Sequence, residues 1–306
     1  MTQTAARDTT RDSSSGLTQS VERALSLLTC FTDAQPALRV ADLVHRLEMS
    51  QSTVSRLLAT LETLGFVERD ARTGLYRLGL ELVTLAGVAL NQSEVRRQAV
   101  GELSAVAAEL GLAANLAILR DDAVFYLASA EGPKAVRQYT LIGKRNPLHC
   151  TAMGKVLVAH LPEADREALL ARLTYRRLTP YSAQSADELR PMLNAVHERG
   201  YAVEREEAAF GRGCIGAAVR DAAGAVVAAT SITGPMRVLD LDRREAELGA
   251  RVLEMADRIS HNLGYITISP PSRARWSAQP PTDVATAPKR KEATHATRST
   301  DPSHSR

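Results

Sequence analysis

The stretch Ser50–Leu64 has the sequence SQSTVSRLLATLETL and is followed by Gly65. Its apolar residues recur at spacings of three and four, which predicts a helix with one apolar stripe. Ser50 is suited to cap the start of this helix and Gly65 to end it. The polar face carries short or planar hydrogen-bonding side chains of the kind that reach bases and phosphates in a major groove: Ser50, Gln51, Ser52, Thr53, Ser55 and Arg56. We therefore predict a DNA-reading helix.

The flanking segments predict a winged helix-turn-helix. Arg39–Glu48 has apolar residues at helical spacing, and Met49 joins it directly to the helix that Ser50 caps. An earlier helix, Ser20–Phe31, adds apolar residues to the same core. After Gly65 the chain has the pattern of a hairpin. We expect this hairpin to be the wing and its arginines to contact backbone phosphates: Arg69, Arg72 and Arg77.

An alternative is a small helical domain in which Ser50 is only a cap. Charge does not decide between the two, because the stretch from Arg39 to Arg77 holds six arginines and five acidic residues. A protein that bound DNA by electrostatics alone would have a larger basic excess. Binding would therefore depend on where the side chains lie and on doubling of the site by a dimer.

Composition predicts a globular protein of the cytoplasm. The 306 residues are 44% hydrophobic and 24% charged, which is ordinary for such proteins. The sequence has no apolar run of membrane-spanning length and no signal-peptide core, so we expect no membrane association. Cys30, Cys150 and Cys214 form neither a disulfide framework nor a zinc spacing. Each is expected to be a small buried residue.

The net charge of +3 is unevenly spread along the chain. Residues 266–306 contain seven basic and three acidic residues, so the preceding 265 residues carry 31 basic and 32 acidic ones. Because this tail is rich in Pro, Ser, Thr and Ala, we predict a disordered basic segment. It could attract DNA weakly or be only a solvated extension. Residues 1–17 have a similar polar composition.

The remaining chain is expected to comprise a DNA-binding domain (18–79), a linker helix (80–92) and a larger domain (93–265). The helical segment Gly79–Leu90 is too apolar to stand free in water, so we predict that it packs on a partner chain. The interface would include Leu82, Leu85 and Val88.

In the larger domain, strand patterns alternate with helical ones, which predicts an α+β fold whose antiparallel sheet is covered by helices. Expected helices are 93–110, 151–160, 164–173, 187–199 and 242–263, and expected strands are 115–119, 124–128, 136–141, 201–206, 215–220 and 226–232.

Several motifs together resemble the isocitrate lyase regulator (IclR) family of bacterial transcription factors. In chain order they are SVERALSLLTCF from Ser20, the helix-turn-helix, PLHCTAMGKVLVAHLP from Pro147, GYAVEREEAAFGRGCIGAAVRD from Gly200 and ATSITGP from Ala229. The resemblance implies a winged helix, a dimerising linker helix and a GAF-like effector domain that binds small organic molecules. It also implies dimers, or dimers of dimers, on palindromic double-stranded DNA operators.

The resemblance places an effector pocket at Ala135, Ala152, Met153, Glu204, Arg212, Cys214, Ser231 and Thr233. Ser231 and Thr233 alternate along a strand, so both hydroxyls would lie on one face; ordinary strand hydroxyls bonded to neighbours are the alternative. Arg212 departs from the apolar residue common in the family, and it could bind an acidic ligand or face solvent. We expect a small carboxylate or aromatic acid as effector and no cofactor.

The resulting expectation is a ligand-responsive repressor of a catabolic or metabolic operon. An activator of the same family remains open. A different class, an enzyme with a Cys214 nucleophile or a metal held by His149, Cys150 and the glutamates at 204, 206 and 207, can also be assembled from these residues. Their spacing does not demand it, and Cys214 lies at the start of an apolar strand rather than beside a helix start or a cation that would activate a thiol.

Overall fold

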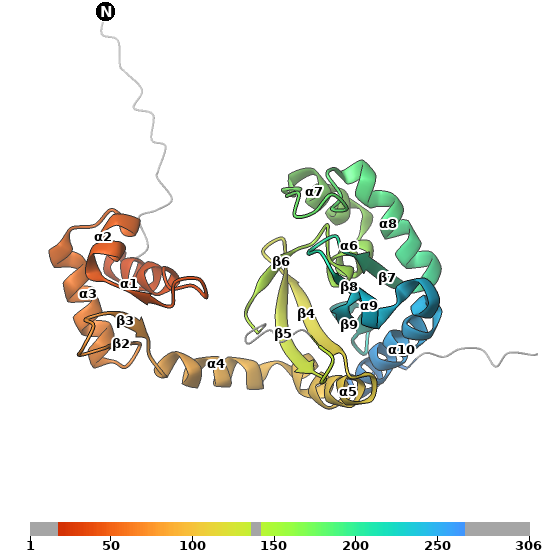
Figure 1. Ribbon diagram of the computed structural model, residues 1–306, viewed down its shortest axis with the longest axis horizontal. Helices are drawn as coiled ribbons and strands as arrows, with labels where there is room; N and C mark the ends of the chain where they lie inside the picture. The colour runs from red at the N-terminus through yellow and green to blue at the C-terminus, as the bar shows by residue number, and fades with distance from the viewer. Residues whose placement is uncertain (1–17, 136–141, 267–306) are drawn as a thin grey trace, which may run out of the picture. The chain divides into compact units, whose positions relative to one another are not determined.

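The computed structural model describes residues 18–135 and 142–266 (Figure 1). The predictions for the strand 136–141 and for the two ends of the chain lie outside the described residues. In the N-terminal part, helices pack on a small antiparallel sheet with strand order β1-β3-β2. The elements are α1 (Gln19–Thr29), β1 (Ala37–Leu38), α2 (Val40–Leu47), α3 (Gln51–Thr63), β2 (Val67–Arg69) and β3 (Tyr76–Leu78).

The apolar stripes of α1, α2 and α3 form the core of this domain. Its fully buried members include Leu27, Leu43, Val54 and Leu58. Glu48, at the end of α2, has a left-handed backbone with φ of 51°. This conformation ends a helix, so the chain turns there and α3 starts as a separate helix. The predicted helix-turn-helix and hairpin are therefore present, with β1 as an additional strand on β3.

After the hairpin, α4 (Glu81–Gln92) carries the apolar residues predicted for the linker helix, and none of its residues is buried. Leu85 and Val88 are 49% and 54% exposed, and Leu82 is half-buried. Gly87, in the middle of this helix, has no heavy atom within 4 Å of where a Cβ would be. Within the described residues, the apolar sides of α4 are therefore largely exposed.

The remaining residues form a six-stranded antiparallel sheet with helices on both faces. Its strand order is β6-β5-β4-β9-β8-β7. The elements are α5 (Glu94–Leu110), β4 (Ala113–Arg120), β5 (Ala123–Glu131), β6 (Arg145–Pro147), α6 (Ala152–Ala159), α7 (Glu163–Arg172), α8 (Ala186–Arg199), β7 (Tyr201–Arg205), β8 (Arg212–Arg220), β9 (Val226–Pro235), α9 (Met236–Leu239) and α10 (Leu241–Asn262).

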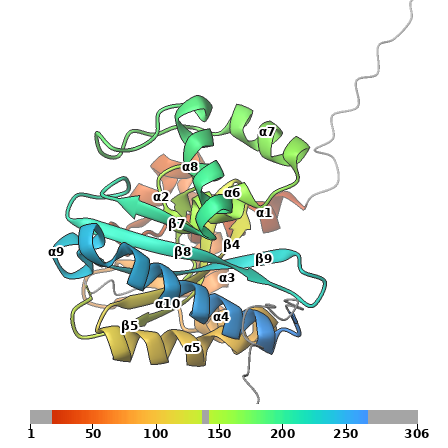
Figure 2. The ribbon, with the colours of Figure 1, turned by 90° about the vertical axis from the view of Figure 1, so that its right-hand side faces the viewer.

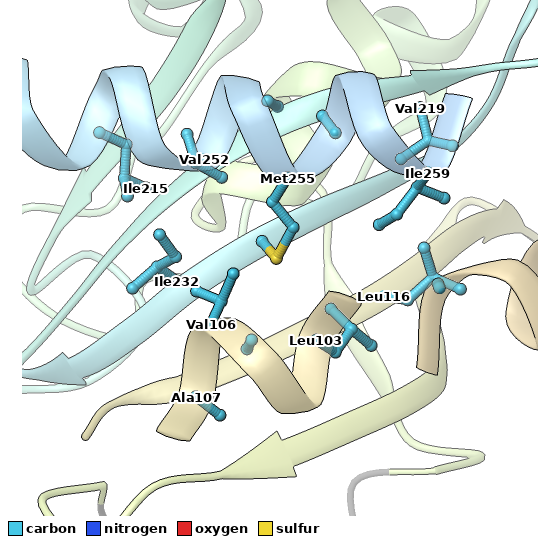
Figure 3. Packing of buried hydrophobic residues seen from close by; sticks show 14 of the residues in the cluster. Leu103, Val106, Ala107, Leu116, Ile215, Val219, Ile232, Val252, Met255 and Ile259 are labelled. Atoms are coloured by element: carbon cyan, nitrogen blue, oxygen red, sulfur yellow. The ribbon is translucent and has the colours of Figure 1, made fainter. Parts of the chain in front are cut away.

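The first face of the sheet is covered by α5 and α10. Figure 2 shows α10 lying across β8 and β9. Because side chains alternate along a strand, Ile215 and Val219 of β8 both face these helices. In Figure 3, Met255 of α10 points toward α5, beside Ile232 of β9 and Val106. This closely packed layer is a rigid support for the other face.

The second face of the sheet is covered by α6, and α8 packs on α6 from outside. Every residue of α6 is buried. The helix comes very close to the sheet because Gly216 of β8 has no side chain: a Cβ there would lie 3.3 Å from the backbone at Ala152 and Met153. Cys214, Ala202 and Ala229 contribute to the core between α6 and the sheet.

The predicted α+β class and the predicted helices of this domain are present, with ends shifted by a residue or two. Strands β4, β5, β8 and β9 run longer than predicted. β6 and α9 were not predicted, because three or four residues are too few to show a periodicity.

Candidate functional site: a DNA-reading helix and a buried effector cavity

The polar face of α3 is open to solvent. Gln51, Ser52, Ser55 and Arg56 are exposed, and Thr53 is half-buried. The Arg56 guanidinium makes no hydrogen bond or ion pair with any residue that the structure describes. Since Val54, Leu58 and Leu61 are buried on the opposite side of the same helix, the core holds α3 with this polar face outward. A free guanidinium next to short polar side chains suits contacts to a base edge.

Ser50 has a structural role in starting α3. Its Oγ accepts a hydrogen bond from the Thr53 N–H at 3.3 Å and lies 3.0 Å from the Ser52 hydroxyl. The capping alternative therefore accounts for Ser50. It does not account for Gln51, Ser55 and Arg56, whose side chains make no hydrogen bond within the described residues.

The wing presents two further arginines that make no hydrogen bond through their side chains within the described residues. The Asp70 carboxylate accepts hydrogen bonds from the Thr73 and Arg72 N–H groups at 2.8 and 2.9 Å, which closes the turn. These bonds lower the pKa of Asp70. Arg72 and Arg77 are exposed. The guanidinium of the third arginine, Arg69, lies over the Tyr76 ring at 5.7 Å from its centroid, and the residue is exposed.

A cavity of about 130 Å³ lies on the α6 face of the larger sheet. All six strands of this sheet, β4 to β9, contribute lining residues, and the start of α6 and the loops around positions 178 and 208 supply the others. Its lining residues are Asn115, Tyr126, Asn146, Pro147, Thr151, Met153, Leu178, Glu204, Ala208, Ala209, Arg212, Cys214 and Thr233. The mixture of apolar groups with a few convergent polar ones is typical of a small-molecule site.

Two charged residues of opposite sign line this cavity. Arg212 is half-buried, and its guanidinium makes no hydrogen bond or ion pair in the part of the chain that the structure describes. Glu204 is 4% exposed, and one of its oxygens accepts from the Glu207 and Ala208 N–H groups at 2.7 and 3.2 Å. Burial raises the pKa of Glu204 to about 7. Glu204 can therefore change charge near neutral pH.

The remaining polar groups of the cavity are neutral. Burial raises the pKa values of the Tyr126 hydroxyl and the Cys214 thiol to about 12. The Tyr126 hydroxyl accepts from Asn146 Nδ2 at 3.2 Å, and the Thr233 hydroxyl donates to the Gly213 carbonyl at 2.9 Å. A thiol nucleophile needs a lowered pKa, so Cys214 is not activated here. The chemistry of the site suits binding rather than covalent catalysis.

Five of the eight residues that the resemblance suggested line this cavity, namely Met153, Glu204, Arg212, Cys214 and Thr233. The other three lie elsewhere. Ser231 is fully buried and accepts from Asn115 Nδ2 at 3.4 Å, and Ala152 is buried where α6 packs on the sheet. Ala135 is half-buried in a turn after β5.

Several lining residues were not predicted as site residues. Asn115 had a detectable signal, because it is a polar residue inside the apolar strand AANLAIL. Its carbonyl Oδ1 accepts from the Ser129 hydroxyl at 2.8 Å, so its side chain is held in place by two strands. Tyr126 and Asn146 had no such signal, since only the pairing of β5 with β4 and β6 brings their segments to this face.

The described residues contain no group of three His, Cys, Asp or Glu side chains that could hold a metal ion. His149 is buried, and its Nε2 lies 3.0 Å from the Arg176 carbonyl. Cys150 is also buried, and burial raises the pKa of its thiol to about 12. None of the helices in residues 18–135 and 142–266 is long and apolar enough to cross a membrane.

Comparisons with known proteins match both domains. The model of the IclR helix-turn-helix domain matches residues 20–71, and that of the bacterial transcriptional regulator IclR C-terminal domain matches residues 87–261. The HTH-type transcriptional regulator XynR of Escherichia coli is 34% identical over 247 residues, 81% of this chain and 98% of XynR. The HTH-type transcriptional repressor AllR of Salmonella typhi is 30% identical over 246 residues, 80% of this chain and 90% of AllR.

A solved structure has the same architecture. It is an IclR homolog from Microbacterium hydrocarbonoxydans complexed with 4-hydroxybenzoate, with a TM-score of 0.70 and 25% identity, covering 80% of this chain and 98% of that one. The matched family models and relatives are transcriptional regulators and not enzymes, which shows that the chain is a DNA-binding transcriptional regulator. The chain belongs to the IclR family.

Proposed function

We propose that α3 reads bases in a palindromic operator and that two copies of the chain bind its two half-sites. The observation that carries this proposal is the exposed polar face of α3, on which the side chains of Gln51, Ser55 and Arg56 make no hydrogen bond within the described residues. Arg72 and Arg77 of the wing are suited to backbone phosphates. The copies are proposed to pair through the α4 face that carries Leu82, Leu85 and Val88, because an apolar helix without cover is a typical interface.

The sign of regulation is proposed to be repression. The name of AllR describes a repressor, and it shares both domains with this chain in one alignment. Effector binding would change the relative placement of two recognition helices and so release the operator of a metabolic operon.

The DNA proposal is tested with Arg56→Ala. Footprinting on genomic fragments identifies an operator, and the variant is expected to bind it about 1 to 3 kcal/mol more weakly, because one base contact is lost. Glu62→Ala, at the other end of the exposed side of α3, is the matched control and should bind as wild type does. Arg72→Ala is expected mainly to reduce the salt dependence of binding. Equal operator affinity for Arg56→Ala and wild type would refute the assignment of α3.

The effector is proposed to be a small monocarboxylate with a ring or a short carbon chain. The cavity of about 130 Å³ is close to the roughly 150 Å³ that accommodates a benzene ring in an engineered protein cavity. Arg212 offers a charge-assisted hydrogen bond to a carboxylate. Glu204 opposes a second negative charge on the ligand, which favours monoanions. The relative with bound 4-hydroxybenzoate supports this class of effector.

In this proposal the three predicted residues outside the cavity lining have supporting roles or none. Ser231 holds the Asn115 side chain, and Ala152 lies at the start of α6 where Gly216 of β8 permits the close approach. Cys214 and Met153 supply apolar surface beside Thr233.

Calorimetry with a panel of aromatic, keto and sugar acids tests the effector proposal. Arg212→Leu is expected to weaken binding of the active acid by about 1.5 to 3 kcal/mol, the usual size of a hydrogen bond to a charged group. Arg237→Leu removes an exposed arginine outside the cavity and is the control. Both variants should bind the operator normally without ligand. If Arg212→Leu binds the acid as tightly as the control does, the effector site lies elsewhere.

A further inference from the structure

One hydroxyl of the proposed effector cavity carries a proton that no described residue accepts. Tyr126 of β5 is 5% exposed and lines this cavity. Its oxygen accepts a hydrogen bond from Asn146 Nδ2 at 3.2 Å, and its own O–H donates to none of the described residues. A buried donor without an acceptor costs free energy, so a molecule that brings an acceptor to Tyr126 would be stabilised.

The electrostatics of this hydroxyl place it toward the cavity. Burial, above all, raises the pKa of Tyr126 to about 12, and smaller contributions come from Cys214, Asn146, Arg212 and Glu204. All four of these residues line the same cavity, so the oxygen end of the Tyr126 ring lies among them. With this pKa the hydroxyl keeps its proton at neutral pH and remains a donor.

Tyr126 and Arg212 differ in how firmly the protein holds them. The Tyr126 N–H donates to the Lys144 carbonyl at 3.1 Å, and its carbonyl accepts from the Gly143 N–H at 2.9 Å. The Tyr126 ring belongs to the core between α6 and the sheet. Arg212 has a longer side chain whose guanidinium has no partner in the described residues. Tyr126 therefore offers a fixed donor, and Arg212 offers a charge that can move to meet an anion.

A carboxylate is the ligand group that suits both residues. It has two oxygens with about four lone-pair sites, so it can accept from a hydroxyl and from a guanidinium at the same time. Hydrogen bonds to an ionised acceptor are about twice as strong as neutral ones. A primary amide is a poorer match, because its NH₂ group would present donors to donors.

We propose that Tyr126 is a specificity-determining residue of the effector site, whose hydroxyl donates to the effector carboxylate while Arg212 supplies the opposite charge. This inference rests on the proposed effector site and adds a second recognition point to it. Tyr126 fixes where the carboxylate lies. Asn146 is a positioning residue, because its Nδ2 occupies the Tyr126 oxygen and leaves only the O–H proton for the ligand.

The test is calorimetry of the full chain with benzoate, 4-hydroxybenzoate and pyruvate, each compared with its primary amide. Ligand-observed NMR extends the measurement to weak binding. At least one acid should bind saturably, and at least about tenfold more tightly than its amide. Tyr126→Phe removes only the hydroxyl and should weaken binding of that acid about tenfold. Tyr201→Phe is the control, because the Tyr201 hydroxyl donates to Glu245 Oε1 at 3.4 Å and lies outside this cavity.

The Arg212→Leu background separates a ligand contact from an effect on the fold. There Tyr126→Phe should cost less than about threefold, because the carboxylate is no longer held at the hydroxyl and residues that share a partner are not additive. A tyrosine that acted only through the fold would cost the same factor in both backgrounds.

The inference is overturned if folded Tyr126→Phe binds the acid as Tyr201→Phe does, if its cost is equal in both backgrounds, or if the amide binds as tightly as the acid. Each of these results leaves the proposed effector site in place as long as Arg212→Leu still weakens binding. If none of the three acids binds, or if Arg212→Leu has no effect, the proposed effector site falls together with the role of Tyr126.

Discussion

Two helices of this protein have similar apolar sequences and opposite surroundings. α6 has the sequence AMGKVLVA and α4 has ELVTLAGVALNQ. Every residue of α6 is buried, and no residue of α4 is. Apolar composition therefore indicates that a helix will be covered, but it does not show whether the cover comes from its own chain or from another.

The difference has a structural cause. α6 packs on the sheet and on α8, and Gly154 lets the helix lie close to the segment that precedes it: a Cβ at Gly154 would lie 2.2 Å from the Leu148 carbonyl oxygen. α4 contacts α5, its neighbour in the chain, and has open space around Gly87. We infer that a second copy of the chain supplies the missing cover of α4.

The largest expected effect comes from placing a charge in each helix. Leu157→Glu in α6 puts a carboxylate at a position that is 5% exposed, so it should reduce the free energy of unfolding of the effector domain by more than about 4 kcal/mol. Leu85→Glu in α4 should leave each protomer folded. Denaturant unfolding followed by circular dichroism measures both. If the two variants lose similar amounts of unfolding free energy, α4 is covered within its own chain.

The next effect concerns assembly. Leu85→Glu is expected to give monomers with much weaker operator affinity, because the carboxylate would be buried between protomers. Val83→Glu makes the same kind of change two positions away, on the opposite side of the helix, and should remain dimeric. Light scattering at micromolar concentration shows whether each variant is a monomer or a dimer. A dimeric Leu85→Glu variant would remove Leu82, Leu85 and Val88 from the proposed interface.

The smallest expected effects come from adding one methyl group to each helix. Gly154→Ala should cost about 1 to 3 kcal/mol, since the new Cβ has no room beside Leu148. Gly87→Ala should stabilise the chain by about 0.5 to 1 kcal/mol, as alanine favours a helix more than glycine does. Thermal unfolding of both variants measures these changes in stability. The opposite result would be a Gly87→Ala dimer that is less stable than the wild-type dimer. If that loss of stability disappears when the protein is diluted to monomer, Gly87 lies in the contact between the two copies.

Local patterns in the sequence were sufficient for the DNA-binding domain. The 3.6-residue periodicity, Ser50 at the start of α3 and the turn residues Asp70 to Gly74 all act within a few residues of one another. The exposed face of α3 follows directly, because burying Val54, Leu58 and Leu61 leaves the polar side outward. The same reasoning predicted most helices and strands of the larger domain.

The proposed effector cavity depended on the tertiary structure. Asn115 and Tyr126 belong to one hairpin, but Arg212 is far from both in sequence, and only the order β5-β4-β9-β8 brings it to the same face. The buried ion pair of Lys155 with Glu207 likewise joins residues from α6 and the loop after β7. Periodicity decides which side of an element is apolar, because that depends on near neighbours. Which strands pair, and therefore which polar groups meet in a cavity, depends on contacts between distant residues that no local pattern specifies.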